Sequence, residues 1–229
     1  ILLVDKPVGM VVHEDESGDS DTLINRIKSY LYHKGEYRPE NELSFAPALC
    51  NRIDRNTCGI VIAAKNAESL RILNQKIRDR ELTKLYLCIA CGKVTPDSAT
   101  LTAYLEKNSD TNTVKISDKK TKSNLTIKTK YKVIAYNGEN SLLKVDLLTG
   151  RTHQIRAHLA YIGHALLGDG KYGNNKLNKK YGFKYQALCS YELQFKFTTD
   201  AGCLSYLDGK CFKAKAPDFV KMFGSNIKL

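Results

Sequence analysis

The chain has 229 residues, of which 42% are hydrophobic and 26% charged, and its formal net charge is +12. This length suffices for one large domain or two small ones with a sizeable core. No apolar run approaches the length of a membrane span and no signal peptide is visible, so we expect no membrane partner. The excess of Lys and Arg favours a polyanionic partner, through electrostatic steering and counterion release.

Seven cysteines form an odd, scattered set, which indicates free thiols in a reducing compartment, and we expect a cytoplasmic protein. Cys88 and Cys91 have CxxC spacing, but they fall in a predicted strand, where alternation places their sulfur atoms on opposite faces. No second CxxC follows, so we expect no zinc site there.

Polar caps and apolar periodicity predict three helices. The first runs from Thr22 to about His33, capped by Asp21. The second is capped by Asn66 and runs to about Arg80. The third covers about 153–162 and is followed by a Gly- and Lys-rich loop at 167–184.

Strands are predicted between and after these helices, and Asn137-Gly138 is a hairpin signal. They are expected near 1–5, 10–13, within 50–64 on both sides of a turn, at 83–91, in short pieces within 92–122, and at 125–136, 141–148, 188–198 and 202–213. Many strands with a few helices predict a single α+β domain over 1–229, with a largely antiparallel or mixed central sheet flanked by helices.

The segment 51–61 holds one carboxylate, Asp54, between Arg52 and Arg55. Nearby positive charge favours an ionised carboxylate, which can act as a covalent nucleophile. An aspartate that only forms salt bridges in a surface turn would have the same sequence, so this segment by itself leaves both interpretations open.

This segment resembles the catalytic motif of the RluA-type pseudouridine synthases, commonly His-Arg-Leu-Asp-Arg-Asp-Thr-Ser-Gly-Leu, which isomerise uridine in folded RNA. It departs from that motif at Asn51 and Cys58. Three further segments resemble the family: a Lys-Pro-x-Gly turn between strands in 1–13, a Lys-x-Tyr strand in 82–92, and Gly-Arg-Thr-His-Gln-Ile-Arg-x-His followed by Gly-Asp-x-x-Tyr-Gly in 148–173. Many members carry a small N-terminal RNA-binding domain, which we expect to be missing from this chain because it starts inside a strand-like run.

The resemblance implies a catalytic role for three residues. Asp54 is the nucleophile, Tyr86 lies against the target uracil, and Arg156 pairs with the catalytic aspartate. Residues expected to contact RNA are Arg52, Arg55, Arg151, His153 and Lys171. Lysines at 119–130 and 171–184 form two basic stretches suited to an RNA backbone, although each lysine could equally be an ordinary solvated side chain.

The function implied is an RNA pseudouridine synthase, an intramolecular transferase that needs no cofactor and no metal. We expect a monomer that acts on ribosomal RNA, with transfer RNA as the other substrate class. The alternative is a non-catalytic basic RNA-binding protein, which would share the charge but would not need the catalytic trio. Zinc ligation by His153, His158 and His164 is disfavoured because the i,i+4 ligand spacing is absent, and hydrogen-bonding or packing roles are preferred.

Overall fold

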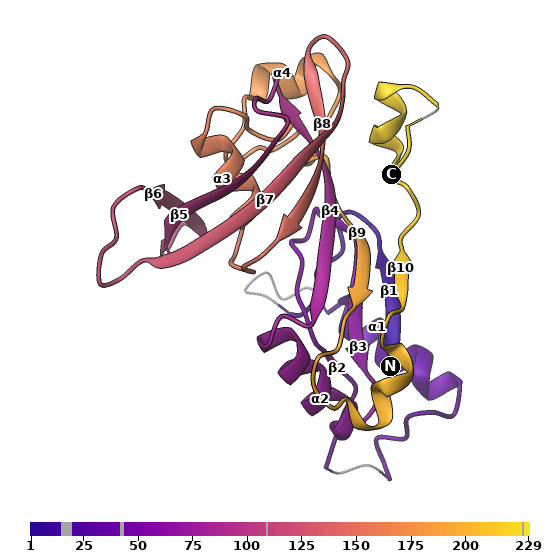
Figure 1. The fold of residues 1–229 in the computed structure, drawn as a ribbon. Helices are drawn as coiled ribbons and strands as arrows, with labels where there is room; N and C mark the ends of the chain where they lie inside the picture. The colour runs from indigo at the N-terminus through magenta and orange to yellow at the C-terminus, as the bar shows by residue number, and fades with distance from the viewer. Residues whose placement is uncertain (15–19, 42–43, 109, 226) are drawn as a thin grey trace. The chain divides into compact units, whose positions relative to one another are not determined.

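The computed structural model describes residues 1–14, 20–41, 44–108, 110–225 and 227–229. They form two compact units: unit 1 comprises Ile1–Thr83 and Glu192–Lys215, and unit 2 comprises Lys84–Tyr191 and Ala216–Leu229. Strands β4 (Leu82–Cys91) and β9 (Leu188–Phe195) each contribute residues to both units (Figure 1). Seven strand pairs are antiparallel, and the combination of this sheet with a few helices confirms the α+β fold expected from the sequence.

Unit 1 combines short antiparallel strands with two α-helices and a 3-10 helix. Its strands are β1 (Leu2–Lys6), β2 (Ala48–Leu49), β3 (Cys58–Ala64) and β10 (Cys211–Lys213), and its helices are α1 (Leu23–His33), α2 (Ala67–Arg78) and the 3-10 helix η1 (Gly202–Leu207). Both β1 and β2 pair with β3. Leu73 of α2 is fully buried in a core with Ile62 and Phe195, as its helical spacing predicts.

The cap of α1 corrects the sequence-based assignment. Thr22, not Asp21, is the N-cap residue, and its hydroxyl accepts a hydrogen bond from the Asn25 N–H at 3.3 Å. Asp21 instead accepts two hydrogen bonds from Arg26, each 2.6 Å long. Aspartate and threonine can both cap a helix. Here the Asp21 carboxylate is engaged by Arg26, and Thr22 caps the helix. The predicted cap Asn66 is confirmed by its bond from the Ser69 N–H.

Unit 2 contains a longer antiparallel sheet in the order β4-β8-β7-β5-β6. Its further elements are β5 (Ser98–Asn108), β6 (Thr113–Ser117), β7 (Leu125–Tyr136), β8 (Asn140–Leu147), α3 (Gln154–Tyr161), α4 (Asn175–Lys180) and the 3-10 helix η2 (Asp218–Phe223). The predicted β7–β8 hairpin is confirmed, and Asn137 closes it by accepting a bond from the Asn140 N–H at 2.8 Å. α3 packs on β5, β6 and β7, where Ala157 joins their apolar side chains (Figure 1).

Four sequence predictions about regular structure are wrong. Residues 10–13 and 50–53 are not strands, and 202–213 forms η1 and then the short β10 instead of one strand. The predicted loop at 167–184 contains α4, whose first turn is capped by the Asn174 side chain. The side chains of Asn174 and Asp200 accept hydrogen bonds from backbone N–H groups at the starts of α4 and η1, and such bonds are weakly encoded in apolar periodicity.

Candidate active site

Asp54 lies in the loop between β2 and β3, and this loop is tied to unit 1 at several points. The Ile62 N–H donates to the Asn51 side-chain oxygen at 2.8 Å, and the Thr57 N–H donates to the Asp54 carbonyl at 3.0 Å. Ile53 is buried, while Asp54 is half-buried and its neighbouring arginines are exposed. The loop therefore holds the carboxylate at the surface on a backbone whose geometry is fixed.

Lys6 is the residue that sequence analysis missed at this loop. Its ammonium group is fully buried and donates to the carbonyls of Pro7 at 2.8 Å, Met10 at 2.8 Å and Arg55 at 2.9 Å. The Gly9 N–H also donates to the Arg55 carbonyl, at 3.0 Å. The Lys-Pro-x-Gly turn thus clamps the residue that follows Asp54. That motif was the available signal, but its sequence alone suits any strand-turn-strand.

Electrostatics also connect Lys6 with the candidate nucleophile. Burial lowers the pKa of Lys6 to about 8, and the nearby Cys58 and Asp54 act in the opposite direction. The Lys6 ammonium group therefore interacts with the Asp54 carboxylate while it holds the carbonyl of the adjacent Arg55.

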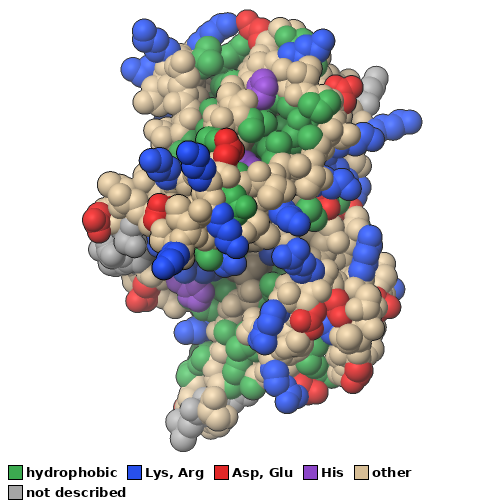
Figure 2. Space-filling view, turned by 60° about the vertical axis from the view of Figure 1, so that its left-hand side comes forward, with side chains coloured by type: hydrophobic (Ala, Val, Ile, Leu, Met, Phe, Trp, Pro, Cys, Tyr) green, Lys and Arg blue, Asp and Glu red, His purple; other side chains and the backbone are tan. Residues whose placement is uncertain are grey.

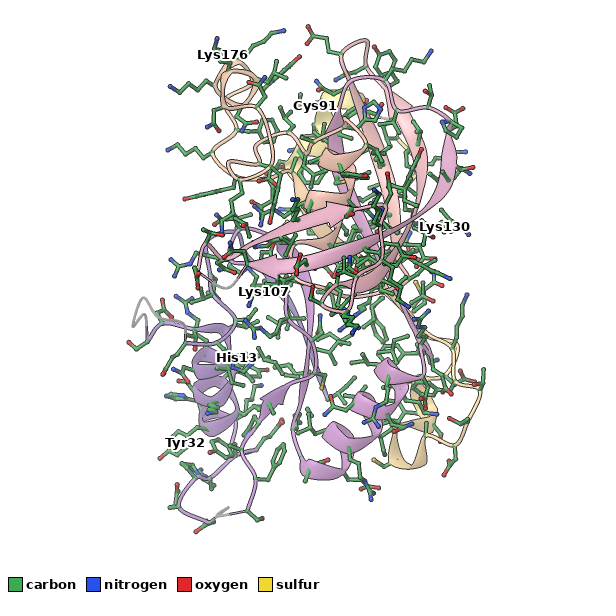
Figure 3. All side chains as sticks on the ribbon, turned by 90° about the vertical axis from the view of Figure 1, so that its left-hand side faces the viewer. His13, Tyr32, Cys91, Lys107, Lys130 and Lys176 are labelled. Carbon is green, nitrogen blue, oxygen red and sulfur yellow. The ribbon has the colours of Figure 1, made fainter. Side chains whose placement is uncertain are left out.

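The surroundings of Arg52 are positively charged. Burial lowers the pKa of His13, and the charges of Arg52 and Lys28 lower it further. His13 lies beside α1, the helix that carries Lys28 (Figure 3). Three basic side chains so close together, one of them exposed, form a suitable contact for a phosphate group.

Arg156 and Asp169 form a buried ion pair in unit 2. Arg156 donates from Nε and Nη2 to the two carboxylate oxygens of Asp169, at 2.7 and 2.9 Å. Arg156 is 5% exposed and Asp169 is 0% exposed. Burial by itself raises the pKa of Asp169, but hydrogen bonding and charge from Arg156, with the N–H groups of Lys171 and Tyr172, lower it below its ordinary value. The sequence-based prediction paired Arg156 with the catalytic aspartate, Asp54. The structure shows that Arg156 also pairs with Asp169.

Tyr172 connects the same loop to the start of α3. Its ring lies 5.3 Å from the Arg156 guanidinium carbon, and its hydroxyl is 2.9 Å from Nδ1 of His153. The Val114 N–H donates to that hydroxyl at 2.9 Å. His153 adopts a left-handed backbone, with φ of 52°, immediately before the helix. His153 and Arg156 are thus held by one tyrosine, whose motif Gly-Asp-x-x-Tyr-Gly was seen in the sequence without a role.

The turn that presents Asp169 requires glycine at both ends. A Cβ on Gly168 would lie 2.0 Å from the Tyr185 carbonyl oxygen, and a Cβ on Gly173 would lie 2.4 Å from the Asp169 carbonyl oxygen. Both separations are far below contact distance, and Gly168 also has φ of +81°. The two glycines therefore permit the tight turn that points the carboxylate at α3.

The remaining predicted residues of unit 2 have distinct environments. Tyr86 is buried on β4, opposite Val145 of β8. Arg151 and Lys171 are exposed, and the Lys171 ammonium donates to the Asn112 carbonyl at 2.8 Å. Asp54 belongs to unit 1, whereas Tyr86 and Arg156 belong to unit 2. The pairing of Arg156 with Asp54 stays a prediction.

The three histidines proposed as rival zinc ligands each form a hydrogen bond. His158 contacts the Thr129 hydroxyl at 2.9 Å, and His164 contacts the Cys91 carbonyl at 3.0 Å, in addition to the His153 contact with Tyr172. Among the residues that the structure describes, no group of three or more His, Cys, Asp or Glu side chains is arranged to hold a metal ion.

Within the part of the chain that the structure describes, no helix is both long and apolar enough to span a membrane. All seven cysteines are free thiols.

A family model described as RNA pseudouridylate synthase matches residues 1–161. The chain belongs to the RNA pseudouridylate synthase family, and the resemblance to its RluA type is confirmed. An uncharacterized RNA pseudouridine synthase of Mycoplasma genitalium is 37% identical over 85% of this chain and 60% of its own length. The ribosomal large subunit pseudouridine synthase D of Borreliella burgdorferi is 32% identical over 76% of this chain and 52% of its own length.

Solved structures support the same fold. Human RNA pseudouridylate synthase domain containing 4 superimposes with a TM-score of 0.72 at 19% identity, covering 96% of this chain and 87% of that one. Human RNA pseudouridylate synthase domain containing 1 gives 0.69 at 21% identity, covering 94% and 79%. The chain spans only about 52–60% of the length of the two bacterial relatives.

Proposed function

We propose that the protein isomerises specific uridines of folded RNA to pseudouridine, with Asp54 as the nucleophile and ribosomal RNA favoured over transfer RNA. The observation that carries the proposal is the Asp54 loop: a half-buried carboxylate whose backbone is clamped by Lys6 and anchored through Asn51. Because the chain belongs to the RNA pseudouridylate synthase family, we assign the catalytic carboxylate to this loop. The Borreliella relative is named a ribosomal large subunit pseudouridine synthase, which supports ribosomal RNA as the proposed substrate class.

The reaction breaks the bond between N1 of uracil and C1′ of ribose, rotates the base, and joins C5 to C1′. A carboxylate suits a sugar carbon with oxocarbenium character, as in retaining glycosidases. Asp54 either attacks C1′ directly or promotes a glycal intermediate. A proton must then leave C5, and Tyr86 or a nearby water is the proposed base. Redox state is unchanged and no phosphate is cleaved, so we propose that neither a cofactor nor a metal is required.

Arg156 is proposed to orient the Asp54 carboxylate. Its two bonds to Asp169 occupy one edge of the guanidinium fork, so the other edge can serve a second carboxylate. Asp169 would then fix the direction in which Arg156 points. The target uridine must leave its stack to reach Asp54, and we propose that Arg52, which is exposed, holds a phosphate or fills the vacated space.

The decisive experiment compares Asp54→Asn with Asp21→Asn in pseudouridine mapping of ribosomal RNA. Asparagine keeps the shape of the side chain but removes the attacking charge, so Asp54→Asn should lose detectable turnover while binding RNA and melting like the parent. Asp21 is a matched control, since it is an exposed aspartate paired with an arginine. Turnover by Asp54→Asn above a few per cent of the parent rate would exclude Asp54 as the nucleophile.

A non-catalytic RNA-binding protein is the alternative that the same experiment addresses. Such a protein would bind RNA with the same charge dependence, but no pseudouridine would form with the parent protein either. Mapping both ribosomal and transfer RNA also separates the two substrate classes, because each modified position is read directly. We further propose a monomer in the cytoplasm, where free thiols such as these persist.

A further inference from the structure

Strand β7 separates its side chains into a buried face and a lysine face. The buried side chains are Ile127, Thr129 and Tyr131, and the exposed ones that alternate with them are Lys128, Lys130 and Lys132. Gln154 of α3 donates to the Thr129 hydroxyl at 3.0 Å, so the helix covers the buried side. We call the exposed side, defined by these three lysines, the β7 lysine face; Figure 3 labels Lys130 on it.

Hydroxyl groups lie next to these lysines on β5. The antiparallel register pairs Lys128 with Thr102, Lys130 with Thr100 and Lys132 with Ser98. All three partners are exposed. Directly opposed residues project to the same side of a sheet, so each ammonium group has a hydroxyl donor beside it. Lysine, serine and threonine side chains are the groups that proteins commonly offer to nucleic-acid phosphates.

The register on the other side of β7 brings one charge of each sign beside the lysines. Lys132 is directly opposite Lys144 of β8, and Lys130 is opposite Asp146. Like charges directly opposite each other destabilise a sheet. Among the residues that the structure describes, Lys128, Lys130 and Lys132 take part in no ion pair. The charge of these three lysines can therefore be neutralised by a bound polyanion.

Protection of a sheet edge does not account for these lysines. Lysine often blocks edge-to-edge pairing of exposed strands. β7 is not an edge strand, because it pairs with β5 on one side and with β8 on the other. An ordinary solvated sheet face would mix both signs of charge along the strand, whereas every exposed charged residue of β7 is a lysine.

The β7 lysine face points away from the predicted catalytic residues of unit 2. Tyr131 on β7 and Tyr86 on β4 are both opposite Val145 of β8, so the three side chains share the buried face. Arg156 belongs to α3, which packs on that same side. RNA held by the lysine face would therefore contact the protein at a site separate from the residues proposed to act on the uridine.

We propose that the β7 lysine face binds the phosphate backbone of RNA, as a second contact remote from the target uridine. The inference extends the proposed function by assigning a second contact with RNA. Lysines two apart on a strand stand roughly 7 Å from each other, which places three charges in a line that a nucleic-acid backbone can follow. Lys and Arg side chains are scattered over the face of the molecule that Figure 2 shows, whereas the three lysines of β7 stand in a row along one strand.

The test uses an RNA duplex of G·C pairs only, which contains no uridine, so that its result does not depend on isomerisation. The variant Lys128→Gln/Lys130→Gln/Lys132→Gln is compared with Lys196→Gln/Lys210→Gln/Lys215→Gln, which removes three exposed lysines of unit 1. Binding is measured by fluorescence anisotropy between about 50 and 200 mM salt. Melting temperatures confirm that both variants are folded.

The β7 variant should bind the duplex roughly tenfold more weakly than the parent. The slope of its affinity against salt should fall by about 3, because each phosphate that is no longer neutralised lowers that slope by about 1. The control should keep the parent slope. Equal losses in both variants would reduce the effect to net charge and overturn the proposal. Displacement of the RNA by polyglutamate at equal charge concentration would also overturn it, in favour of an acidic protein partner.

Separate readouts distinguish this proposal from the proposed function. Pseudouridine formation in a uridine-containing RNA is measured separately from duplex binding, so that a loss of RNA contact is told apart from a loss of isomerisation. If the parent forms no pseudouridine but the β7 variant still loses duplex binding, the isomerase assignment fails and the RNA-binding face stands.

Discussion

The buried ion pair of Arg156 with Asp169 allows a quantitative test of how the helix α3 is held. Asp169→Asn keeps an acceptor for the N–H groups of Lys171 and Tyr172 but leaves the Arg156 charge buried without its carboxylate. Removing one partner of a buried pair costs about 3–5 kcal/mol. For a chain of this size, each kcal/mol lowers the melting temperature by about 2–4 °C, so we expect a decrease of roughly 6–20 °C.

The assay is a double-mutant cycle of Asp169→Asn, Arg156→Met and their combination, followed by urea denaturation. The combined variant should be more stable than the sum of the single losses predicts, because no unpaired charge remains. Arg156→Lys should recover little, since an ammonium group cannot reproduce the two parallel bonds. Additive losses would refute the reasoning, because they would mean that the two groups do not interact.

An exposed pair with the same geometry serves as the control. Arg26 donates from Nε and Nη2 to Asp21 at 2.6 Å, but both side chains are about 60% exposed. Arg26→Met should leave stability nearly unchanged, because solvent screens the charges.

The pH dependence of stability provides a second check on the Arg156–Asp169 pair. The folded pKa of Asp169 is lowered, so its stabilisation is present above its unfolded pKa of about 3.9 and disappears as the pH falls through the folded value.

Two further predictions follow from titration and charge. Burial lowers the pKa of His158 to about 4, so the neutral imidazole is stable in the fold and stability should decline as the pH falls from about 6.5 to 4. In His158→Gln, the urea midpoint should depend less on pH across this range. If the midpoint falls with pH as steeply as in the parent, His158 is not the cause of the decline. Arg52→Ala should weaken RNA binding and single-turnover rate while melting like the parent, because Arg52 is exposed. A lowered melting temperature with parent-like binding would show that it supports the fold instead.

Local sequence was sufficient for most elements and for the candidate loop. The period of apolar residues placed α2 and α3, and the turn residues Asn137 and Gly138 placed the β7–β8 hairpin. These features depend on neighbours within a few residues, so they can be read along the chain. The same local reading failed at 10–13 and at 202–213, where side-chain hydrogen bonds and turns outweigh β propensity.

The role of buried charge required the tertiary structure. Lys6 lies 49 residues from the Arg55 carbonyl that it binds, and Asp169 lies 13 residues from Arg156. In sequence, each is one of many charged residues, and most charged residues are exposed. Burial decides which of them must be paired, and burial is a property of the folded chain.

The sequence by itself determined the family, the α+β fold and the residues that carry its motifs, because each motif is a short run of chemistry and turn geometry. Only the tertiary structure decided which backbone groups hold the Asp54 loop, which carboxylate holds Arg156, and that three lysines spaced two apart share one open face of β7. The physical reason is that charge and hydrogen-bonding capacity belong to single residues, whereas their partners are chosen by strand register and by exclusion of water.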